Sequence, residues 1–332
     1  MHHRLIPGKA LDPASPWKVT QDYLNALPPS TTPLSTLTPL GLNKEPIRAL
    51  KSNRRTRLMA IFNVTTDSFS DGGEHLPPTE TDASPKLDRR PQKLDKFIEN
   101  GATIIDIGGQ STAPGAKDVP VELETERVLD AISLLQDKNI LISVDTFRAP
   151  VAEAACKAGA HIINDVSAGV LDPEMLPTMA RLGTTVCLMH MRGTPQTMMK
   201  KTDYSPDGLI PTVAKELLER VAAAEEAGIR RWRIILDPGI GFAKNLEQNL
   251  ELLRRFDELR NWPGLRGLPW LVGTSRKSFI RRILGVQTIA HTLLGTSATV
   301  AAAIEGGADI VRVHDVSHMA KVVKVADAIW RV

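Results

Sequence analysis

The feature that most constrains this chain is an alternation of short apolar runs and helical stretches, which begins near Arg57 and repeats eight times. Runs rich in β-branched residues, bounded by polar and glycine-containing segments, are typical of buried strands. The eight runs are Leu58–Val64, Thr103–Ile107, Ile140–Val144, His161–Val166, Thr185–Met189, Trp232–Leu236, Trp270–Val272 and Ile310–Val313. Because parallel strands need long crossover connections, the alternation predicts a parallel sheet.

The segments between these runs carry helical signals, and several end in glycine, which suits a helix C-terminus. The clearest are Val121–Gln136, Ala149–Ala158, Leu209–Ala227, Leu246–Leu259 and Thr292–Glu305. Eight strand–helix units match an α/β fold of the TIM (β/α)8 barrel type, which usually has roughly 250 residues. A doubly wound open sheet is the alternative, but no GxGxxG motif follows the first run.

Two segments lack a regular period. Residues 1–50 contain many prolines and a Ser/Thr-rich stretch, so we predict a linker or extended arm there, followed by one barrel over residues 51–332. A second irregular segment, Gly72–Pro91, is long for a loop in a compact domain, and such loops usually have a functional role.

Composition excludes several classes of protein. Lys and Arg outnumber Asp and Glu by only 41 to 38 in 332 residues, so we expect no nucleic-acid partner. No apolar stretch is long enough to span a membrane, and the first residues lack the apolar core of a signal peptide. The only cysteines are Cys156 and Cys187, so we expect a reducing compartment, the cytoplasm or alternatively the mitochondrion.

Polar residues follow almost every predicted strand. In a parallel barrel all the carboxyl ends of the strands meet at one face, and active sites form there. Alone, Asp67 or Asp165 is better explained as a helix cap, and His314 as a structural histidine. The structural explanation weakens when all eight strands end in this way. The residues concerned include Asn63, Asp67, Asp106, Asp145, Asn164, Asp165, His190, Asp237, Ser275, Lys277, Arg312 and His314.

The first half of this cluster is rich in acceptors: Asp106, Asp145, Asn164 and Asp237. Buried carboxylates are unfavourable unless they are paired or hydrogen-bonded, and a flat heterocycle with several N–H donors would satisfy them. A pterin is such a ring. Lys277 and Asn164 are suited to its acceptor atoms.

The second half, Asn63, Arg312 and His314, suits an anion. Arginine offers a bidentate fork for phosphate, and Mg²⁺ is typically held by one or two protein oxygens together with phosphate and water. We therefore predict a pyrophosphate leaving group and Mg²⁺ bound through Asn63. Without an HExxH motif, paired CxxC motifs or a GxxxxGK[ST] motif, a zinc enzyme or a P-loop protein is not indicated.

Three motifs resemble those of dihydropteroate synthases. Asn63–Gly73 reads NVTTDSFSDGG, where the family usually has NVTPDSFSDGG; Asp106–Gly115 resembles the second signature, and Ser275–Ser278 the SRKS motif. The resemblance covers about residues 55–332. It is nearest to fungal enzymes, in which this domain commonly follows aldolase and pyrophosphokinase domains, so residues 1–50 are similar to the junction after such a kinase.

The resemblance implies a transferase of folate biosynthesis, the target of sulfonamides. The family joins 6-hydroxymethyl-7,8-dihydropterin diphosphate to 4-aminobenzoate by an SN1-like mechanism, releases pyrophosphate, and usually forms homodimers. By resemblance, the pterin is held by Asp106, Asp145, Asn164, Asp237 and Lys277, of which Asp145, Lys277 and Asp106 are also catalytic. By resemblance, Asn63, Arg312 and His314 hold diphosphate and Mg²⁺, and Thr112, Pro114, Phe242 and Ser275 border the aminobenzoate.

Two positions depart from the family pattern. Ala113 replaces the arginine of the usual STRPG, which removes a cation near the diphosphate unless a neighbour such as Lys117 compensates, and Thr66 replaces a proline. A non-catalytic pterin-binding module is therefore one alternative. A pterin-dependent methyltransferase of the same barrel family is another, although Lys277, Arg312 and His314 have no evident role there.

Overall fold

The protein folds as a barrel of eight parallel strands surrounded by helices, as the computed structural model shows for residues 47, 49, 52–64, 89–110 and 118–332. The strands pair in the order β6-β5-β4-β3-β2-β1-β8-β7, and a parallel bridge between Leu236 and Trp270 joins the two outermost strands. The strands are β1 (Arg57–Asn63), β2 (Ile104–Gly108), β3 (Leu141–Asp145), β4 (Ile162–Asp165), β5 (Thr185–Met189), β6 (Ile234–Asp237), β7 (Leu271–Val272) and β8 (Ile310–Val313). The predicted TIM barrel is confirmed.

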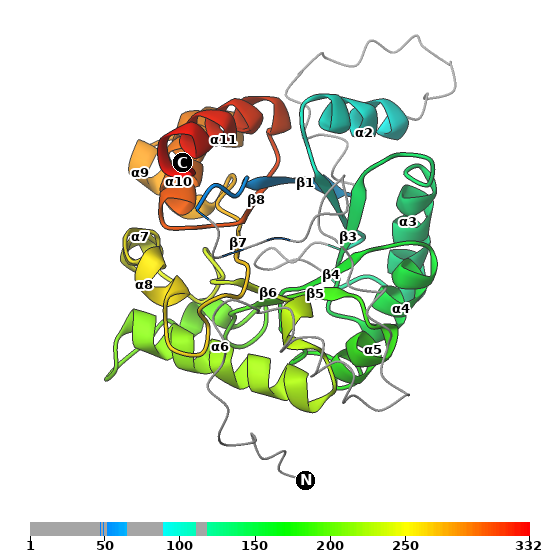
Figure 1. Ribbon diagram of the computed structural model, residues 1–332, viewed down its shortest axis with the longest axis horizontal. Coiled ribbons are helices and arrows are strands. Elements are labelled where there is room, and N and C mark those ends of the chain that lie inside the picture. The colour runs from blue at the N-terminus through cyan, green and yellow to red at the C-terminus, as the bar shows by residue number, and fades with distance from the viewer. Residues whose placement is uncertain (1–46, 48, 50–51, 65–88, 111–117) are drawn as a thin grey trace, which may run out of the picture. The chain divides into compact units, whose positions relative to one another are not determined.

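The helices form a ring outside the strands, from α3 and α4 on one side to α10 and α11 on the other (Figure 1). The α-helices are α2 (Arg90–Glu99), α3 (Val121–Ser133), α4 (Ala149–Lys157), α5 (Met175–Leu182), α6 (Leu209–Glu226), α7 (Leu246–Arg254), α8 (Phe256–Arg260), α9 (Ser278–Leu284), α10 (Leu293–Glu305) and α11 (Val316–Trp330). The 3-10 turns are η3 (Met198–Lys200), η4 (Arg231–Arg233) and η5 (Ile289–Thr292). No helix in this described part of the chain is both long and apolar enough to cross a membrane.

Several boundaries differ from the sequence prediction by one to three residues, and two of the differences have a clear structural reason. The helix expected over Leu246–Leu259 is two helices, because Arg255 leaves helical geometry and α8 restarts at Phe256. The break places the Phe256 ring edge-on against the buried Trp270, with centroids 5.5 Å apart. The irregular segment expected to reach Pro91 ends earlier, since Pro91 lies in the first turn of α2, where its missing N–H is tolerated. The rest of that segment and the predicted arm lie almost entirely outside the described residues.

The inside of the barrel is filled at one level by a layer of buried apolar side chains. Each strand contributes one residue to this layer. Some neighbouring members are matched in register, as Met59 is with Ile104, and others are offset by two residues, as Leu141 and Ile162 are. The layer consists of Met59, Ile104, Leu141, Ile162, Cys187, Ile235, Leu271 and Ile310. The barrel is thus a packed core and not a channel, in keeping with other barrels of this type.

The amino-terminal end of the barrel is tied together by a buried acid. Asp309, just before β8, accepts a hydrogen bond from Arg54 Nε at 2.6 Å and from the Trp270 backbone N–H at 3.0 Å. These contacts connect the starts of β1, β7 and β8, the region where the sheet closes on itself. Polar groups at the amino-terminal end therefore stabilise the fold, while those at the carboxyl end of the strands are available for an active site.

Candidate active site

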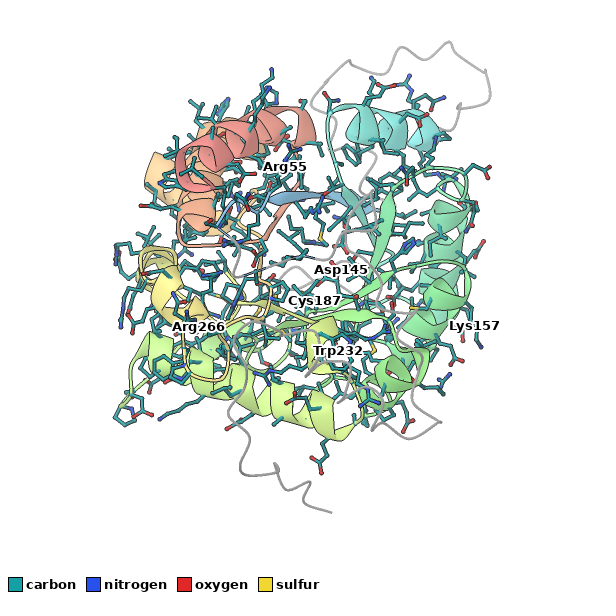
Figure 2. The ribbon with its side chains drawn as sticks, viewed as in Figure 1. Arg55, Asp145, Lys157, Cys187, Trp232 and Arg266 are labelled. Atoms are coloured by element: carbon teal, nitrogen blue, oxygen red, sulfur yellow. The ribbon has the colours of Figure 1, made fainter. Side chains whose placement is uncertain are left out.

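The candidate site follows from the two-residue period of the strands. Since side chains alternate between the two faces of a strand, the residue two places after each member of the apolar layer also points into the barrel. In β2, β4, β6 and β8 those next residues are Asp106, Asn164, Asp237 and Arg312. Asp145, at the end of β3, lies inside the ring of strands near Cys187, whereas Lys157 lies on the outer rim (Figure 2).

A buried ionic network joins the carboxylates from β2 and β3 to an arginine from β8. Arg312 donates from Nε to Asp106 Oδ2 at 2.6 Å and from Nη2 to Asp145 Oδ2 at 2.5 Å. Ser143 and Asn164 also donate to Asp106, at 2.5 Å and 3.1 Å. Asp106 is therefore fully paired within the protein.

Asp145 is not fully paired. Its Oδ1 atom is buried and has no hydrogen-bond partner among the described residues, although Oδ2 accepts from Arg312. Burial raises the pKa of Asp145 to about 7, against the opposing effect of Arg312. A buried acceptor without a partner destabilises the folded state, so this atom is positioned to accept a hydrogen bond from a ligand.

A lysine and an aromatic ring form the next wall. Lys277 Nζ lies 4.2 Å from the centre of the Phe242 ring, and burial lowers the pKa of Lys277 to about 8. Asp237 accepts the Gly239 backbone N–H at 2.7 Å, and burial raises the pKa of Asp237 to about 6. Burial thus moves the pKa of both side chains toward neutral pH, which makes their charge sensitive to a bound partner.

On the β7–β8 side, Ser275 and His314 contact one another. His314 lies with Nδ1 3.0 Å from the Ser275 hydroxyl, and burial, followed by the charge of Arg276, keeps the pKa of His314 well below its ordinary value. His314 is therefore neutral and offers a ring N–H and not a positive charge. Arg276 is paired with Asp315 at 2.9 Å, and its φ of 60° lies in the left-handed region.

Asn63 ends β1 beside the glycine that ends β2. A Cβ on Gly108 would lie 3.1 Å from the Asn63 side-chain oxygen, so the glycine leaves room for this amide. Within the described residues, no group of three His, Cys, Asp or Glu side chains could hold a metal ion. A metal at Asn63 would therefore take most of its ligands from a bound substrate and water, which fits the preference of Mg²⁺.

Most of the predicted site residues converge. Asp106, Asp145, Asn164, Asp237, Lys277, Arg312, His314, Phe242, Ser275 and Asn63 all lie at the carboxyl-end face of the strands. The expected division into a pterin half and a diphosphate half is less sharp, since Arg312 is bonded to the carboxylates of the first half. Thr112 and Pro114, like Thr66, Asp67 and Ala113, lie outside the described residues.

Asp165 illustrates the structural explanation for a polar strand end. Its carboxylate accepts the backbone N–H groups of Ser167 at 2.7 Å and Gly169 at 2.6 Å. It therefore holds the turn after β4. The contrast with Asp145, which keeps a free oxygen, separates a structural acid from a site acid.

Sequence reasoning missed three buried polar residues of this region. Ser143 supports Asp106, and Glu124 accepts from Thr146 Oγ1 at 2.7 Å and from Arg148 at 2.9 Å, below the β3–α4 turn. The two-residue period would have found Ser143. Glu124 lies on a helix and carries no such signal, and neither does the buried Lys244.

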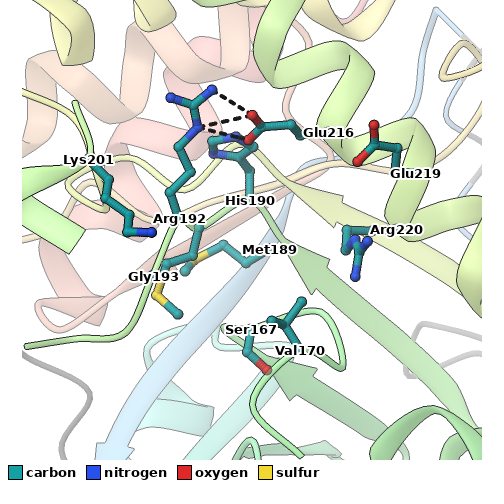
Figure 3. Close-up of a pocket in the computed structure, with 11 residues that line it drawn as sticks. Ser167, Val170, Met189, His190, Arg192, Gly193, Lys201, Glu216, Glu219 and Arg220 are labelled. Carbon is teal, nitrogen blue, oxygen red and sulfur yellow. Dashed lines mark hydrogen bonds and ion pairs between the residues drawn. The ribbon is translucent and has the colours of Figure 1, made fainter. Parts of the chain in front are cut away.

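A separate cavity of about 540 Å³ lies between the end of β5 and helix α6. Figure 3 shows Arg192 bonded to Glu216 across it, with His190 alongside and Lys201 and Arg220 on opposite sides. The cavity does not include Asp106, Asp145 or Arg312, so it is not the site built by the strand ends.

Fold and site together define a (β/α)8-barrel protein whose binding site occupies the carboxyl-end face, the place where enzymes of this fold carry their active sites. The chain belongs to the pterin binding enzyme family, which its sequence matches over residues 59–314. The family predicted from the sequence motifs is confirmed.

Similar proteins have dihydropteroate synthase names. One from Synechocystis is 47% identical over 84% of this chain and 91% of its own length. A solved dihydropteroate synthase of Yersinia pestis, in complex with a sulfonamide drug, is 38% identical with a TM-score of 0.74, over 83% of this chain and 94% of the other. The synthase of Xanthomonas albilineans with 4-aminobenzoic acid is 38% identical with a TM-score of 0.72, over 84% of this chain and 94% of the other.

A fungal relative is longer than this chain. The folic acid synthesis protein fol1 of Pneumocystis carinii is 51% identical over 83% of this chain, but the match spans only 36% of the fungal protein. The chain therefore corresponds to about a third of that relative.

The raised pKa of Asp145 predicts a pH effect on stability. Between its ordinary pKa of 3.8 and about 7, the folded protein binds more protons at this group than the unfolded chain does, so its contribution to stability is lost as the pH rises through 7. In urea unfolding at pH 5 and pH 8, the wild-type protein should lose more free energy of unfolding than Asp145→Asn. The difference should be about 1.4 kcal/mol or more, the equivalent of one pKa unit. Asp237 and Asp165 titrate in both proteins and cancel, so equal losses would refute the assignment.

Proposed function

We propose that this chain is a dihydropteroate synthase, which condenses 6-hydroxymethyl-7,8-dihydropterin diphosphate with 4-aminobenzoate to give 7,8-dihydropteroate and pyrophosphate. The observation that carries the proposal is the buried Oδ1 of Asp145, which has no partner in the described part of the chain and lies in a barrel mouth lined by further acceptors. Similarity to named synthases over most of the chain supports the same activity.

The acidic wall recognises the pterin ring. Asp145 and Asp237 accept from the ring N–H and amino groups, and Asn164 and Lys277 meet acceptor atoms of the ring. Asp237 is 6% exposed and Asn164 4% exposed, so these contacts form away from bulk water and discriminate strongly between donors and acceptors. Asp106 contributes indirectly, because its bonds to Ser143 and Arg312 hold the other groups in place.

The reaction breaks the carbon–oxygen bond to the diphosphate before the carbon–nitrogen bond forms. The departing oxygen keeps the electron pair, and the positive charge left on the methylene carbon spreads into the pterin ring. The carboxylates of Asp145 and Asp106 stabilise this developing charge. The neutral arylamine then donates its lone pair and loses a proton, so no strong general base is required.

The diphosphate lies on the Asn63, Arg312 and His314 side. Arg312, whose Nε and Nη2 are bonded to Asp106 and Asp145, contributes positive charge, and neutral His314 supplies a ring N–H. We propose that Mg²⁺ is held by the Asn63 amide oxygen together with diphosphate oxygens; when bound, it neutralises charge that builds up on the leaving group.

The aminobenzoate lies against Phe242, Ser275 and Lys277, where Lys277 supplies a cation for the carboxylate and the Phe242 ring a flat apolar surface. The predicted contributions of Thr112 and Pro114 remain part of this proposal. The same pocket is the sulfonamide site, because a sulfonamide drug presents a similar aromatic amine.

Two other functions are less well supported. A pterin-dependent methyltransferase would share the pterin-binding carboxylates, but it would have no anionic leaving group for Lys277 and Arg312 to bind. A non-catalytic pterin-binding module is suggested only by Ala113. Our proposal assigns Arg312 to the diphosphate side, so the loss of one arginine in the second motif does not remove all positive charge there.

We also propose that the chain forms a homodimer through α9, η5 and α10, elements that contact one another. Large apolar side chains are exposed along them: Leu294 is 80% exposed, Ile283 54%, and Leu284 and Ile289 42% each. Adjacent exposed apolar residues of this size mark association surfaces. Asn63, Asp145 and Asp237 lie on other elements, so the interface leaves the site open.

For the compartment we propose the cytosol or the mitochondrion. Cys156 and the buried Cys187 are free thiols, as expected in a reducing environment. A relative from Arabidopsis thaliana carries the name folate synthesis bifunctional protein, mitochondrial.

The activity is tested by supplying the purified chain with both substrates and Mg²⁺. We expect stoichiometric release of pyrophosphate and formation of dihydropteroate, both dependent on 4-aminobenzoate. Pterin binding without pyrophosphate release would overturn the enzyme assignment in favour of a binding module. Transfer of a methyl group would favour the methyltransferase.

Asp237→Ala should weaken pterin binding by about a hundredfold or more. It removes a buried charged acceptor, and such a hydrogen bond contributes about 1.5–3 kcal/mol in addition to the cost of the unpaired ligand donor. Isothermal titration with the pterin measures the effect. Asp207→Ala, an exposed acid paired with Lys215, is the control and should bind normally. Unchanged affinity in Asp237→Ala would refute its role.

The proposed dimer is tested by Leu294→Glu combined with Ile283→Glu. A charge at each position opposes burial, so sedimentation should show a monomer where the wild-type chain shows a dimer. Val170→Glu, at a residue 56% exposed on the β4–α5 connection, should leave the association unchanged. A dimer in the double variant would contradict this interface.

A further inference from the structure

We propose that the buried Lys244 is a positioning residue for the active site: it clamps the loop between β6 and α7, residues 239–243, and through it fixes Lys277 and Phe242. The kinetic test of this role rests on the proposed function, because it measures synthase activity. Lys244 is not part of the barrel wall and does not belong to the three motifs that identified the family.

Lys244 uses all of its donors inside the protein. The side chain is 2% exposed, and Nζ lies 2.9 Å from His190 Nδ1, 3.1 Å from the Gly239 carbonyl oxygen and 3.1 Å from the Phe242 carbonyl oxygen. An ammonium group has three N–H donors, and each has an acceptor here. Two of the three acceptors are main-chain atoms of the loop, so Lys244 ties the start of the loop to its end.

The third acceptor anchors the clamp to the rest of the barrel. His190 follows β5 and its Nε2 lies 2.9 Å from Glu216 of helix α6. If Nε2 carries the proton, Nδ1 is free to accept from Lys244, so one neutral tautomer satisfies both contacts. Glu216 is fixed in turn by Arg192 (Figure 3). The Arg192 guanidinium lies over the Tyr204 ring, 4.2 Å from its centre.

The loop needs such support because its backbone is strained. Gly239, Gly241 and Ala243 all have positive φ values, 68°, 80° and 49°. Ala243 has no glycine freedom, and such a residue persists only where its surroundings enforce the conformation. Further side chains hold the same loop: Tyr204 donates to the Ala243 carbonyl at 3.0 Å, and Asn249 accepts the Gly241 N–H at 2.6 Å.

The loop in turn determines where the reactive side chains lie. A Cβ on Gly241 would come within 3.0 Å of Lys277 Cδ, so the stem of Lys277 packs directly on the loop backbone. The Phe242 ring lies under Lys277 Nζ, and the Gly239 N–H binds Asp237. A shift of the loop would therefore move the cation that meets the pterin and the surface that faces the aminobenzoate.

The test compares steady-state kinetics of Lys244→Met, which keeps most of the side-chain volume, with the wild-type chain. We expect kcat/KM to fall by between about tenfold and about a hundredfold, the range that small misplacements of reactive groups produce. In a double-mutant cycle with Lys277→Ala, adding Lys244→Met to Lys277→Ala should cost less than about threefold. This non-additivity is the sign that Lys244 acts through Lys277. Additive losses would overturn the proposal.

Two further variants separate positioning from general stability. Arg233→Met removes another buried cation, 4% exposed, at the opposite end of β6, and should lower the melting temperature while KM for both substrates stays the same. Tyr204→Phe removes a single hydrogen bond to the loop and keeps the aromatic ring. It should raise KM for 4-aminobenzoate in the same direction as Lys244→Met, by a smaller factor.

The outcomes distinguish the two proposals. A wild-type chain with no synthase activity would contradict the proposed function. An active wild-type chain, with Lys244→Met and Tyr204→Phe both folded and kinetically unchanged, would contradict only the positioning role.

Discussion

The site depends on one interaction above all, the fork of Arg312 between two buried carboxylates. It joins β8 to β2 and β3, strands that lie more than 150 residues apart in sequence. Without it, Asp106 and Asp145 would face one another as like charges in a low dielectric, where removal of one partner of a buried pair typically costs about 3–5 kcal/mol. The arginine thus permits a concentration of acids that could not otherwise be buried.

Three ionisable side chains of the site have pKa values close to neutral pH. Burial raises the pKa of Asp145 to about 7 and of Asp237 to about 6, and it lowers the pKa of Lys277 to about 8. Each group is therefore near the point at which a ligand with complementary hydrogen bonds can complete its ionisation. Asp106, which is fully paired, supports this arrangement, while Asp145 retains an oxygen for the ligand. The proposed stabilisation of a transient cation by Asp145 relies on that difference.

The residues that make the barrel rigid and the residues that form the site lie at different levels along the barrel axis. The apolar layer fills the barrel below the site, and Asp309 holds the amino-terminal end where the sheet closes. Above the layer, the reactive side chains lie on strand ends and on the clamped β6–α7 loop. Strand ends are more precise supports than free loops, because their backbone hydrogen bonds are already satisfied by neighbouring strands. Phe242 lies beyond the strands on this loop, and Lys277, which follows β7, packs against it, which explains why the loop carries so many side-chain bonds.

The sequence by itself determined the barrel, the family and most of the site. The polar residues at the ends of the predicted strands placed Asp106, Asn164, Asp237 and Arg312 on one face, since the carboxyl ends of parallel barrel strands meet there. It could not determine pairing across the barrel: which acid Arg312 would bind, or that Asp145 would keep a free oxygen. Nor could it show the role of Lys244. Those outcomes depend on distances between segments far apart in the chain, and on burial, which no local pattern of residues encodes.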